Sequence, residues 1–190
     1  FTALHAQVMA VEIERCGGRA QYPPDVLLAG RRPLLQYPAE ILEATAANPN
    51  AIGVALLDRV SGRVVGYALG SPLENHDEEG VSSDPHHGEG NTFYLQAHST
   101  LPSVKNSAEL ENLMFETIRS RAAAAGFQFV SALIEERVHD TGPPWLRGAA
   151  VLETLDNYLR SGIRFIYLQA ALTARHFLHL RPLRARRVRR

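Results

Sequence analysis

The sequence predicts a single α/β domain in which a mixed β-sheet is flanked by helices. Two apolar runs lie on either side of a Ser61-Gly62 turn signal, which is typical of a β-hairpin. Further along the chain, short apolar runs alternate with a strongly periodic helix pattern, the order expected of a sheet that contains a crossover. The apolar fraction is 45% and the charged fraction 21%, values ordinary for a folded protein. A chain of 190 residues fits one domain.

The N-terminal quarter combines helix patterns with proline-rich connections. Residues 2–15 have the apolar spacing of an amphipathic helix, and Gly17 and Gly18 follow it directly. Residues 20–50 are rich in proline, and within them residues 39–47 predict a short helix.

The predicted hairpin spans residues 52–69 and turns at Ser61-Gly62. Residues 71–91 follow, and they are polar, rich in turn formers and without periodicity. We expect them to form an exposed, mobile loop that leads into a strand at residues 92–98.

The second half of the chain alternates helices and strands. Residues 108–125 predict the longest helix, because Leu110, Met114 and Ile118 share one face and Gly126 follows its end. The further expected elements are a strand at 127–135, a helix at 149–161, and closing strands at 164–169 and 176–180. The order strand, helix, strand, helix implies at least one parallel strand pair.

Charge and cysteine content limit the possible environments of the protein. The formal net charge is zero, with acidic residues concentrated in 74–89 and arginines in the C-terminal segment. We therefore divide the chain into one domain, residues 1–183, and a basic tail, residues 184–190.

The single cysteine, Cys16, favours a reducing compartment and hence the cytoplasm. The longest uncharged apolar run, 165–174, is too short to cross a bilayer, so no membrane contact is predicted.

Histidines and carboxylates in the acidic segment raise the question of a metal site. Imidazole and carboxylate groups do bind divalent metals. His86 and His87 and their acidic neighbours lie in a stretch with no regular element to fix ligand geometry, so a solvated loop is favoured and no metal is predicted. The sequence also lacks the glycine signatures of serine hydrolases, P-loop enzymes and classical dehydrogenases.

The late segment from Leu155 to Phe165, with Tyr158 and Gly162, is similar to the "LYxxxGF" motif of the GCN5-related N-acetyltransferases. The order of predicted elements also resembles that family over almost the whole chain. The resemblance implies a central mixed sheet and an N-acyltransferase that moves an acetyl or other acyl group from acyl-CoA, most simply acetyl-CoA, to an amine. In that family the motif places a helix that ends on glycine before the next strand.

The same resemblance implies where the donor would bind. The family holds the pyrophosphate of acetyl-CoA with an R/Q-x-x-G-x-G/A loop at the start of a helix, where backbone N–H groups attract anions. The aligned residues are Lys105, Asn106, Ser107 and Ala108. Lys105 keeps a cation and Ala108 a small side chain, whereas Glu109 and Leu110 depart from the pattern.

Candidate catalytic groups follow from the same comparison and from the chemistry. In the family a tyrosine at the position of Tyr158 often protonates the leaving thiolate. Attack requires a neutral amine, so a base must accept its proton near the ends of the strands. His98 and Glu135, or the neighbouring Glu136, are the candidates, although each of them has an ordinary structural explanation as well.

Two other functions remain open from the sequence. One is a binding or regulatory module that keeps the fold without catalysis, and the other is an acyltransferase with a non-CoA donor. The expected partner is an amine-bearing small molecule or protein. Homodimer formation is left open, and nucleic-acid contact by the basic tail is a minor alternative.

Overall fold

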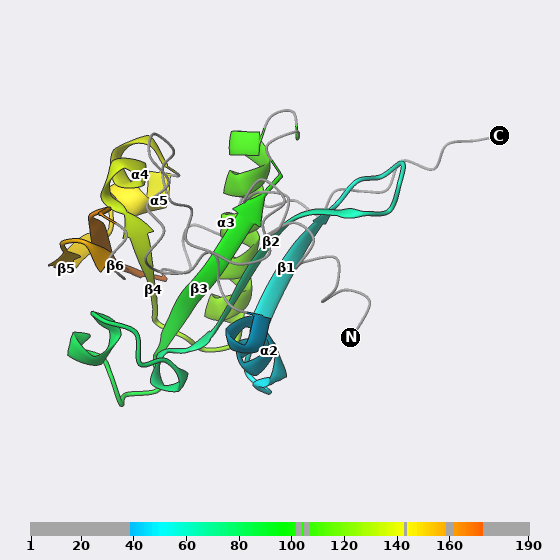
Figure 1. Cartoon of the computed structure of the whole chain (residues 1–190). Coiled ribbons are helices and arrows are strands. Elements are labelled where there is room, and N and C mark those ends of the chain that lie inside the picture. Colours follow the sequence, from blue (N-terminus) through cyan, green and yellow to red (C-terminus); the bar gives the residue numbers. More distant parts are fainter. Residues whose placement is uncertain (1–38, 102–103, 105–106, 143, 159–161, 173–190) are drawn as a thin grey trace.

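The computed structural model describes residues 39–101, 104, 107–142, 144–158 and 162–172 (Figure 1). The strands are β1 Ile52–Leu57, β2 Val64–Pro72, β3 Thr92–Thr100, β4 Phe129–Glu135, β5 Ala150–Leu155 and β6 Phe165–Ala171. The helices are α2 Ala39–Ala47, α3 Ser107–Ala124, α4 Glu136–Thr141 and α5 Pro144–Arg147, with 3-10 turns at Leu73–Asn75 and Val81–Ser83.

The six strands form one mixed sheet in the order β1-β2-β3-β4-β6-β5. The pair of β3 and β4 is parallel, and the other four pairs are antiparallel. Helix α3 provides the crossover between β3 and β4, as a parallel pair requires. The predicted mixed α/β sheet with one parallel pair is confirmed.

Helices cover both faces of the sheet, with α3 behind it and α2 in front in Figure 1. Alternate strand residues point to opposite faces, so Ala68 of β2 packs in the core beneath α3 while its neighbour Tyr67 packs against α2. A third apolar cluster lies on the face away from α3, where the segment between β2 and β3 covers the sheet. Its buried members are Leu73, Val81, Tyr94, Leu133, Leu155, Tyr158 and Tyr167.

A β-bulge changes the direction of β3 halfway along its length. Leu69 lies opposite Ala97 and Gly70 opposite Leu95, so Gln96 is the extra residue. A Cβ atom on Gly70 would lie 2.2 Å from the carbonyl oxygen of Tyr94, so only glycine fits at this position. The bulge therefore needs a close approach of two backbones.

Strands β3 and β4 separate toward their carboxyl ends. They pair only from Thr92 with Phe129 to Leu95 with Ala132, although both strands continue beyond those residues. Figure 1 shows the two arrows starting together and pointing apart. Beyond the last pair, the facing edges of the two strands have no ladder between them in the described residues.

Most elements expected from the sequence are present. The hairpin of β1 and β2 turns through Gly62, whose φ of 69° suits glycine. Helix α2, strands β3, β4 and β6, and helix α3 lie at the expected places within a few residues. The helix expected at 2–15, the strand at 176–180 and the basic tail at 184–190 fall outside the described residues.

The prediction of a helix at 149–161 is wrong. Residues 150–155 form the edge strand β5, which pairs antiparallel with β6, and Asn157 then turns with a φ of 58°. Pairing with β6 outweighs a weak helical pattern, because the strand gains backbone hydrogen bonds along the edge that faces β6. The helical segment comes earlier, as α4 and α5, between the stretches expected to form a strand at 127–135 and a helix at 149–161.

The loop expected at 71–91 is more ordered than predicted. It contains two 3-10 turns, and Leu73, His76, Val81 and Asp84 are buried against the sheet. The alternation of these residues with exposed acidic ones follows no regular period, which is why the sequence pattern did not predict their burial. No helix within the described residues is long and apolar enough to span a membrane.

Candidate functional site

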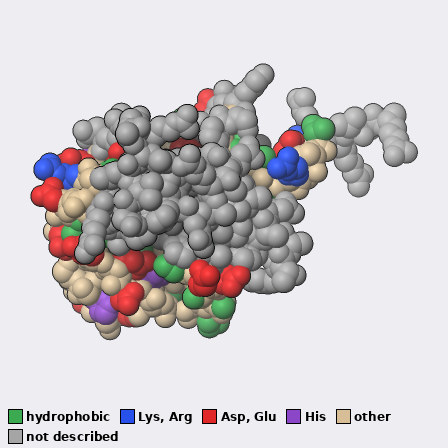
Figure 2. All heavy atoms as spheres, viewed as in Figure 1, with side chains coloured by type: hydrophobic (Ala, Val, Ile, Leu, Met, Phe, Trp, Pro, Cys, Tyr) green, Lys and Arg blue, Asp and Glu red, His purple; other side chains and the backbone are tan. Residues whose placement is uncertain are grey.

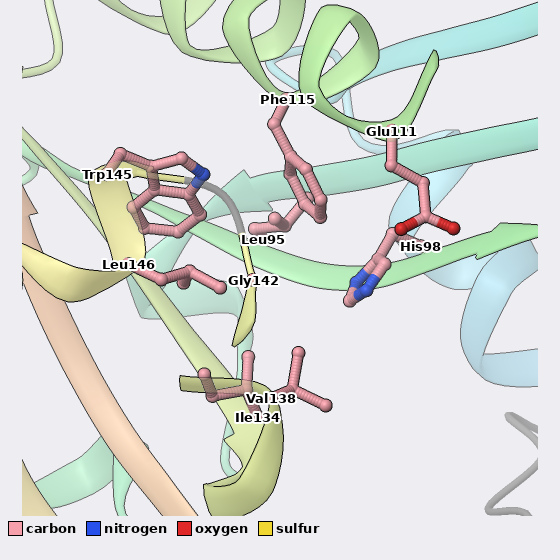
Figure 3. A pocket seen from close by; sticks show the side chains of 9 residues that line it. All are labelled: Leu95, His98, Glu111, Phe115, Ile134, Val138, Gly142, Trp145 and Leu146. Atoms are coloured by element: carbon pink, nitrogen blue, oxygen red, sulfur yellow. The ribbon is translucent and has the colours of Figure 1, made fainter. Parts of the chain in front are cut away.

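A pocket of about 170 Å³ opens where β3 and β4 separate, on the face covered by α3 (Figure 3). Leu95 and His98 come from β3, and Ile134 comes from β4. Helices α3, α4 and α5 supply the remaining walls. The apolar side chains that line it are Leu95, Phe115, Ile134, Val138, Trp145 and Leu146.

Two polar side chains, His98 and Glu111, lie on the pocket wall nearest the start of α3. The His98 ring meets the edge of Phe115 with 4.8 Å between ring centroids, and the side chain is exposed at the rim. Glu111 is half-buried, and burial raises the pKa of its carboxyl, with a smaller opposing effect from Thr100. A carboxyl with a raised pKa holds its proton more readily than a surface glutamate.

Trp145 forms the opposite wall of the pocket. It is 7% exposed, and within the described part of the chain its indole nitrogen has no hydrogen-bond partner. Phe115 meets its ring edge-on at 5.9 Å, and the guanidinium of Arg119 lies 5.5 Å from the ring centroid. In Figure 3 the indole nitrogen lies on the side of the ring toward Phe115. The indole N–H group is itself buried, so it is not exposed to a ligand in the pocket.

A second group of polar residues lies on the other face of the sheet, around Tyr158. Tyr158 follows β5 and is 7% exposed in the cluster that contains Leu133 and Leu155. Burial, and then the charges of Glu78 and Glu79, raise the pKa of its hydroxyl to about 12. The hydroxyl therefore keeps its proton throughout the neutral range.

Glu78 is the carboxylate that the segment between β2 and β3 carries toward this face. Gln96, the bulge residue, donates a 3.0 Å hydrogen bond to its Oε1, and His76 Nδ1 lies 3.6 Å from its Oε2. Burial alone would raise the pKa of Glu78, but the close approach of His76 and the hydrogen bond from Gln96 outweigh it and lower the pKa. Acidic side chains and histidines gather over the same part of the molecule (Figure 2). The face carries an ionised carboxylate.

Comparisons with known proteins identify the fold. No family model matches the chain, and no curated protein matches it by sequence. Among solved structures, a GNAT-family protein from Desulfovibrio desulfuricans superimposes with a TM-score of 0.58 at 14% identity, covering 91% of this chain and 95% of that one. The fold is that of the GCN5-related N-acetyltransferases.

Two further structures support this acetyltransferase fold. An aminoglycoside 6'-N-acetyltransferase complexed with coenzyme A matches with a TM-score of 0.57 at 14% identity, over 91% of this chain and 93% of that one. Ard1 from Thermoplasma volcanium matches with a TM-score of 0.56 at 11% identity, over 91% and 94%. At these identities the likeness shows the N-acetyltransferase fold and not the activity.

On this N-acetyltransferase fold, the catalytic candidates are divided between the two faces of the sheet. His98 lines the pocket beneath α3, whereas Tyr158 lies in the cluster on the opposite face. Glu135 ends β4 one residue after the pocket residue Ile134, so strand alternation places it on the Tyr158 side. Glu136 lies 3.5 Å from Arg164 in an exposed ion pair.

The residues expected to hold the donor pyrophosphate lie at the start of α3. Ser107 and Ala108 are the first two residues of the helix, so their backbone N–H groups belong to its first turn. Lys105 and Asn106 lie outside the described residues. Within the described part of the chain, no group of histidine, cysteine and acidic side chains is arranged to hold a metal ion.

The helix expected around the "LYxxxGF"-like segment is replaced by a hairpin. Leu155 ends β5, Tyr158 lies in the connection and Phe165 begins β6. The helix that ends beside a glycine and leads into a strand is α5, which is followed by Gly148 and β5. The motif match therefore located Tyr158 in the fold's late region but misassigned its local structure.

Sequence reasoning missed Glu111 and Trp145. Glu111 borders the apolar face of α3, four residues before Phe115, so a helical projection would have placed it one turn from an aromatic core residue. Trp145 is the only tryptophan in the chain and follows two prolines. A lone tryptophan carries no pattern, so only the packing of α5 against α3 reveals its role.

Proposed function

We propose that the protein is an N-acyltransferase that transfers an acyl group from an acyl-CoA to an amine. The observation that carries this proposal is the pocket at the separation of β3 and β4, on an N-acetyltransferase fold. The coenzyme A complex of a structure with this fold supports the choice of donor. Acetyl-CoA is the simplest donor of this class.

The described residues suit such a donor in two ways. Beyond Leu95 and Ala132 the facing edges of β3 and β4 present backbone N–H and C=O groups that amides of a pantetheine arm would satisfy. The first turn of α3, at Ser107 and Ala108, offers backbone N–H groups to a pyrophosphate. Lys105 and Asn106, which precede it, complete the proposed phosphate contact.

The proposed reaction is direct attack of the amine nitrogen on the thioester carbonyl carbon. The C–N bond forms, the C–S bond breaks, and the sulfur leaves as a thiolate that takes a proton. We assign that proton to the Tyr158 hydroxyl, which burial keeps protonated. The proton lost by the amine goes to Glu135 or His98, the two bases on either side of the strand ends.

The face around Tyr158 is the proposed approach of the acceptor. Glu78 is ionised there, and an ionised carboxylate attracts the ammonium form of an amine. An amine-bearing small molecule or protein fits this charge. The amine must lose its proton before attack, so Glu135 on the same face is the preferred base.

Calorimetric titration of the full chain with acetyl-CoA and with CoA tests the first step. A ligand present at 100 times its dissociation constant stabilises the folded state by about 2.7 kcal/mol, so a thermal shift should accompany binding. Release of free thiol in the presence of an amine panel then tests transfer. Binding without thiol release would favour a regulatory module, and absence of binding would leave only a non-CoA donor or no catalysis.

A further inference from the structure

The pocket beneath α3 is larger than an acetyl group requires. An apolar protein cavity of about 150 Å³ accommodates a benzene molecule, and this pocket has about 170 Å³. The methyl group of an acetyl thioester would fill only a small part of that space. Protein interiors are close-packed, with few voids larger than a water molecule, so an opening of this size has room for a ligand group.

The lining of the pocket indicates which part of an acyl-CoA would enter it. Six of the lining side chains are apolar, and the polar ones, His98 and Glu111, lie together on one wall. A pantetheine arm carries amides that need hydrogen-bond partners, which the open edges of β3 and β4 supply better than these walls. A hydrocarbon chain needs none. The pocket suits the acyl chain and the strand edges suit the pantetheine arm.

The position of the pocket relative to the strands agrees with this division. Leu95, the last β3 residue paired with β4, lines the pocket, so the cavity begins where the strand edges open. Ile134 lines it from β4 two residues beyond Ala132, the last β4 residue paired with β3. A thioester held between the edges would therefore lie beside the mouth of the pocket. Its acyl chain would extend toward Trp145 and Leu146 on the far wall (Figure 3).

We propose that this pocket binds the acyl chain of the donor and selects a benzene-sized acyl group, such as a six-carbon or benzoyl group, over acetyl. The proposal rests on the proposed acyl-CoA function and adds the size class of the acyl group. In a pocket of this size each additional buried methylene should increase the affinity for the thioester, because burial in an apolar site is favourable in proportion to area.

Fluorescence of Trp145 gives a direct measure of occupancy, since the chain has one tryptophan and it forms the pocket wall. Titrating the full chain with CoA, acetyl-CoA, hexanoyl-CoA and benzoyl-CoA should change its emission most with the two larger thioesters. Their affinity should exceed that of acetyl-CoA by about tenfold or more, the effect of even a single methylene in a well-fitted hydrophobic pocket.

A pocket-filling variant with a matched surface control locates the effect. Val138→Phe places extra volume in the pocket and should reduce the ratio of hexanoyl-CoA to acetyl-CoA affinity by about tenfold. Val151→Phe adds the same volume on β5, where Val151 is 47% exposed, and should leave the ratio unchanged. If Val138→Phe does not fold, Val138→Ala enlarges the pocket and should shift the preference to a longer chain.

The outcomes separate this inference from the function on which it rests. If no thioester binds, the proposed function fails. If acetyl-CoA binds as tightly as the larger thioesters, the function stands and the acyl-size inference is overturned. If Val138→Phe weakens CoA and all thioesters equally, the pocket holds the shared pantetheine arm, which also overturns the inference.

Discussion

The Tyr167 hydroxyl on β6 donates a 2.6 Å hydrogen bond to Oδ2 of Asp84, a residue 83 positions earlier in the segment that crosses the sheet. Gln169 donates to both oxygens of the same carboxylate at 3.0 Å. Asp84 is buried, so these bonds satisfy a group that would otherwise lie unsolvated against apolar side chains. They fix the segment between β2 and β3, and with it Glu78, over the proposed acceptor face.

Asp84→Ala should lower the free energy of unfolding by about 2–3 kcal/mol, because it leaves two buried donors without their charged acceptor. Urea denaturation measures the change. Asp77→Ala, in the same segment but exposed, should change stability by less than about 0.5 kcal/mol. Hydrogen exchange of the 73–91 backbone should rise in the first variant only. Equal stability of the two variants would show that the bonds do not hold the segment.

Gly70→Ala should destabilise the fold by about 2 kcal/mol or more, because the added Cβ would lie 2.2 Å from the Tyr94 carbonyl oxygen and 2.7 Å from the Phe93 ring. Gly53→Ala on β1 is the matched control, since its nearest neighbour would be Leu69 Cδ1 at an ordinary 3.6 Å. Thermal unfolding of both variants checks the difference. A Gly70→Ala protein as stable as the control would contradict the register at the bulge.

Glu111→Gln should stabilise the protein at neutral pH. Burial raises the pKa of the Glu111 carboxyl above its ordinary 4.5, so the unfolded state ionises first as pH rises, and the parent loses stability across that window. Glutamine has no charge and does not show this loss. The free energies of unfolding of the parent and the variant should therefore differ at pH 7 and converge below the ordinary pKa of glutamate. Unfolding measured across this pH range tests the sign.

The control for this prediction is Glu109→Gln, an exposed carboxylate on the same helix. It should show no comparable gain at neutral pH, because an exposed glutamate has little desolvation to relieve. A gain in both variants would point to the overall charge of α3 rather than to burial in the pocket.

Tyr158→Phe should lower turnover by about 10²-fold with little change in acyl-CoA affinity, if Tyr158 protonates the thiolate, because a general acid acts in the transition state. Single-turnover rates and calorimetric affinities measure the two effects separately. The hydroxyl has a pKa of about 12, so it should contribute no alkaline decline in rate below pH 10.

Stability at high pH gives an independent test of the buried hydroxyl. The unfolded tyrosine ionises near pH 10 and the folded one near pH 12, so the unfolding free energy of the parent should fall over that interval. The fall should be smaller in Tyr158→Phe, which has no hydroxyl to ionise. Parallel curves for parent and Tyr158→Phe would contradict the raised pKa.

Sequence patterns were sufficient where an element buries one regular face. The period of apolar residues on α3 and the two runs around Gly62 each report a local arrangement, so their elements were predicted within a few residues. Strand β5 was missed because it is an edge strand whose Val151 and Leu152 are exposed, and its state depends on pairing with β6. His98 was placed at a strand end by the same local reasoning, and it lines the pocket.

The sequence by itself determined the β1–β2 hairpin and the order β3-α3-β4, and hence a mixed sheet with a parallel pair. The tertiary structure alone decided where those two strands part, which side chains line the resulting pocket, and that Glu111 and Trp145 face each other across it. Periodicity records which side of an element is buried. It carries no information on the distance between elements, because that distance depends on contacts between residues far apart in the sequence.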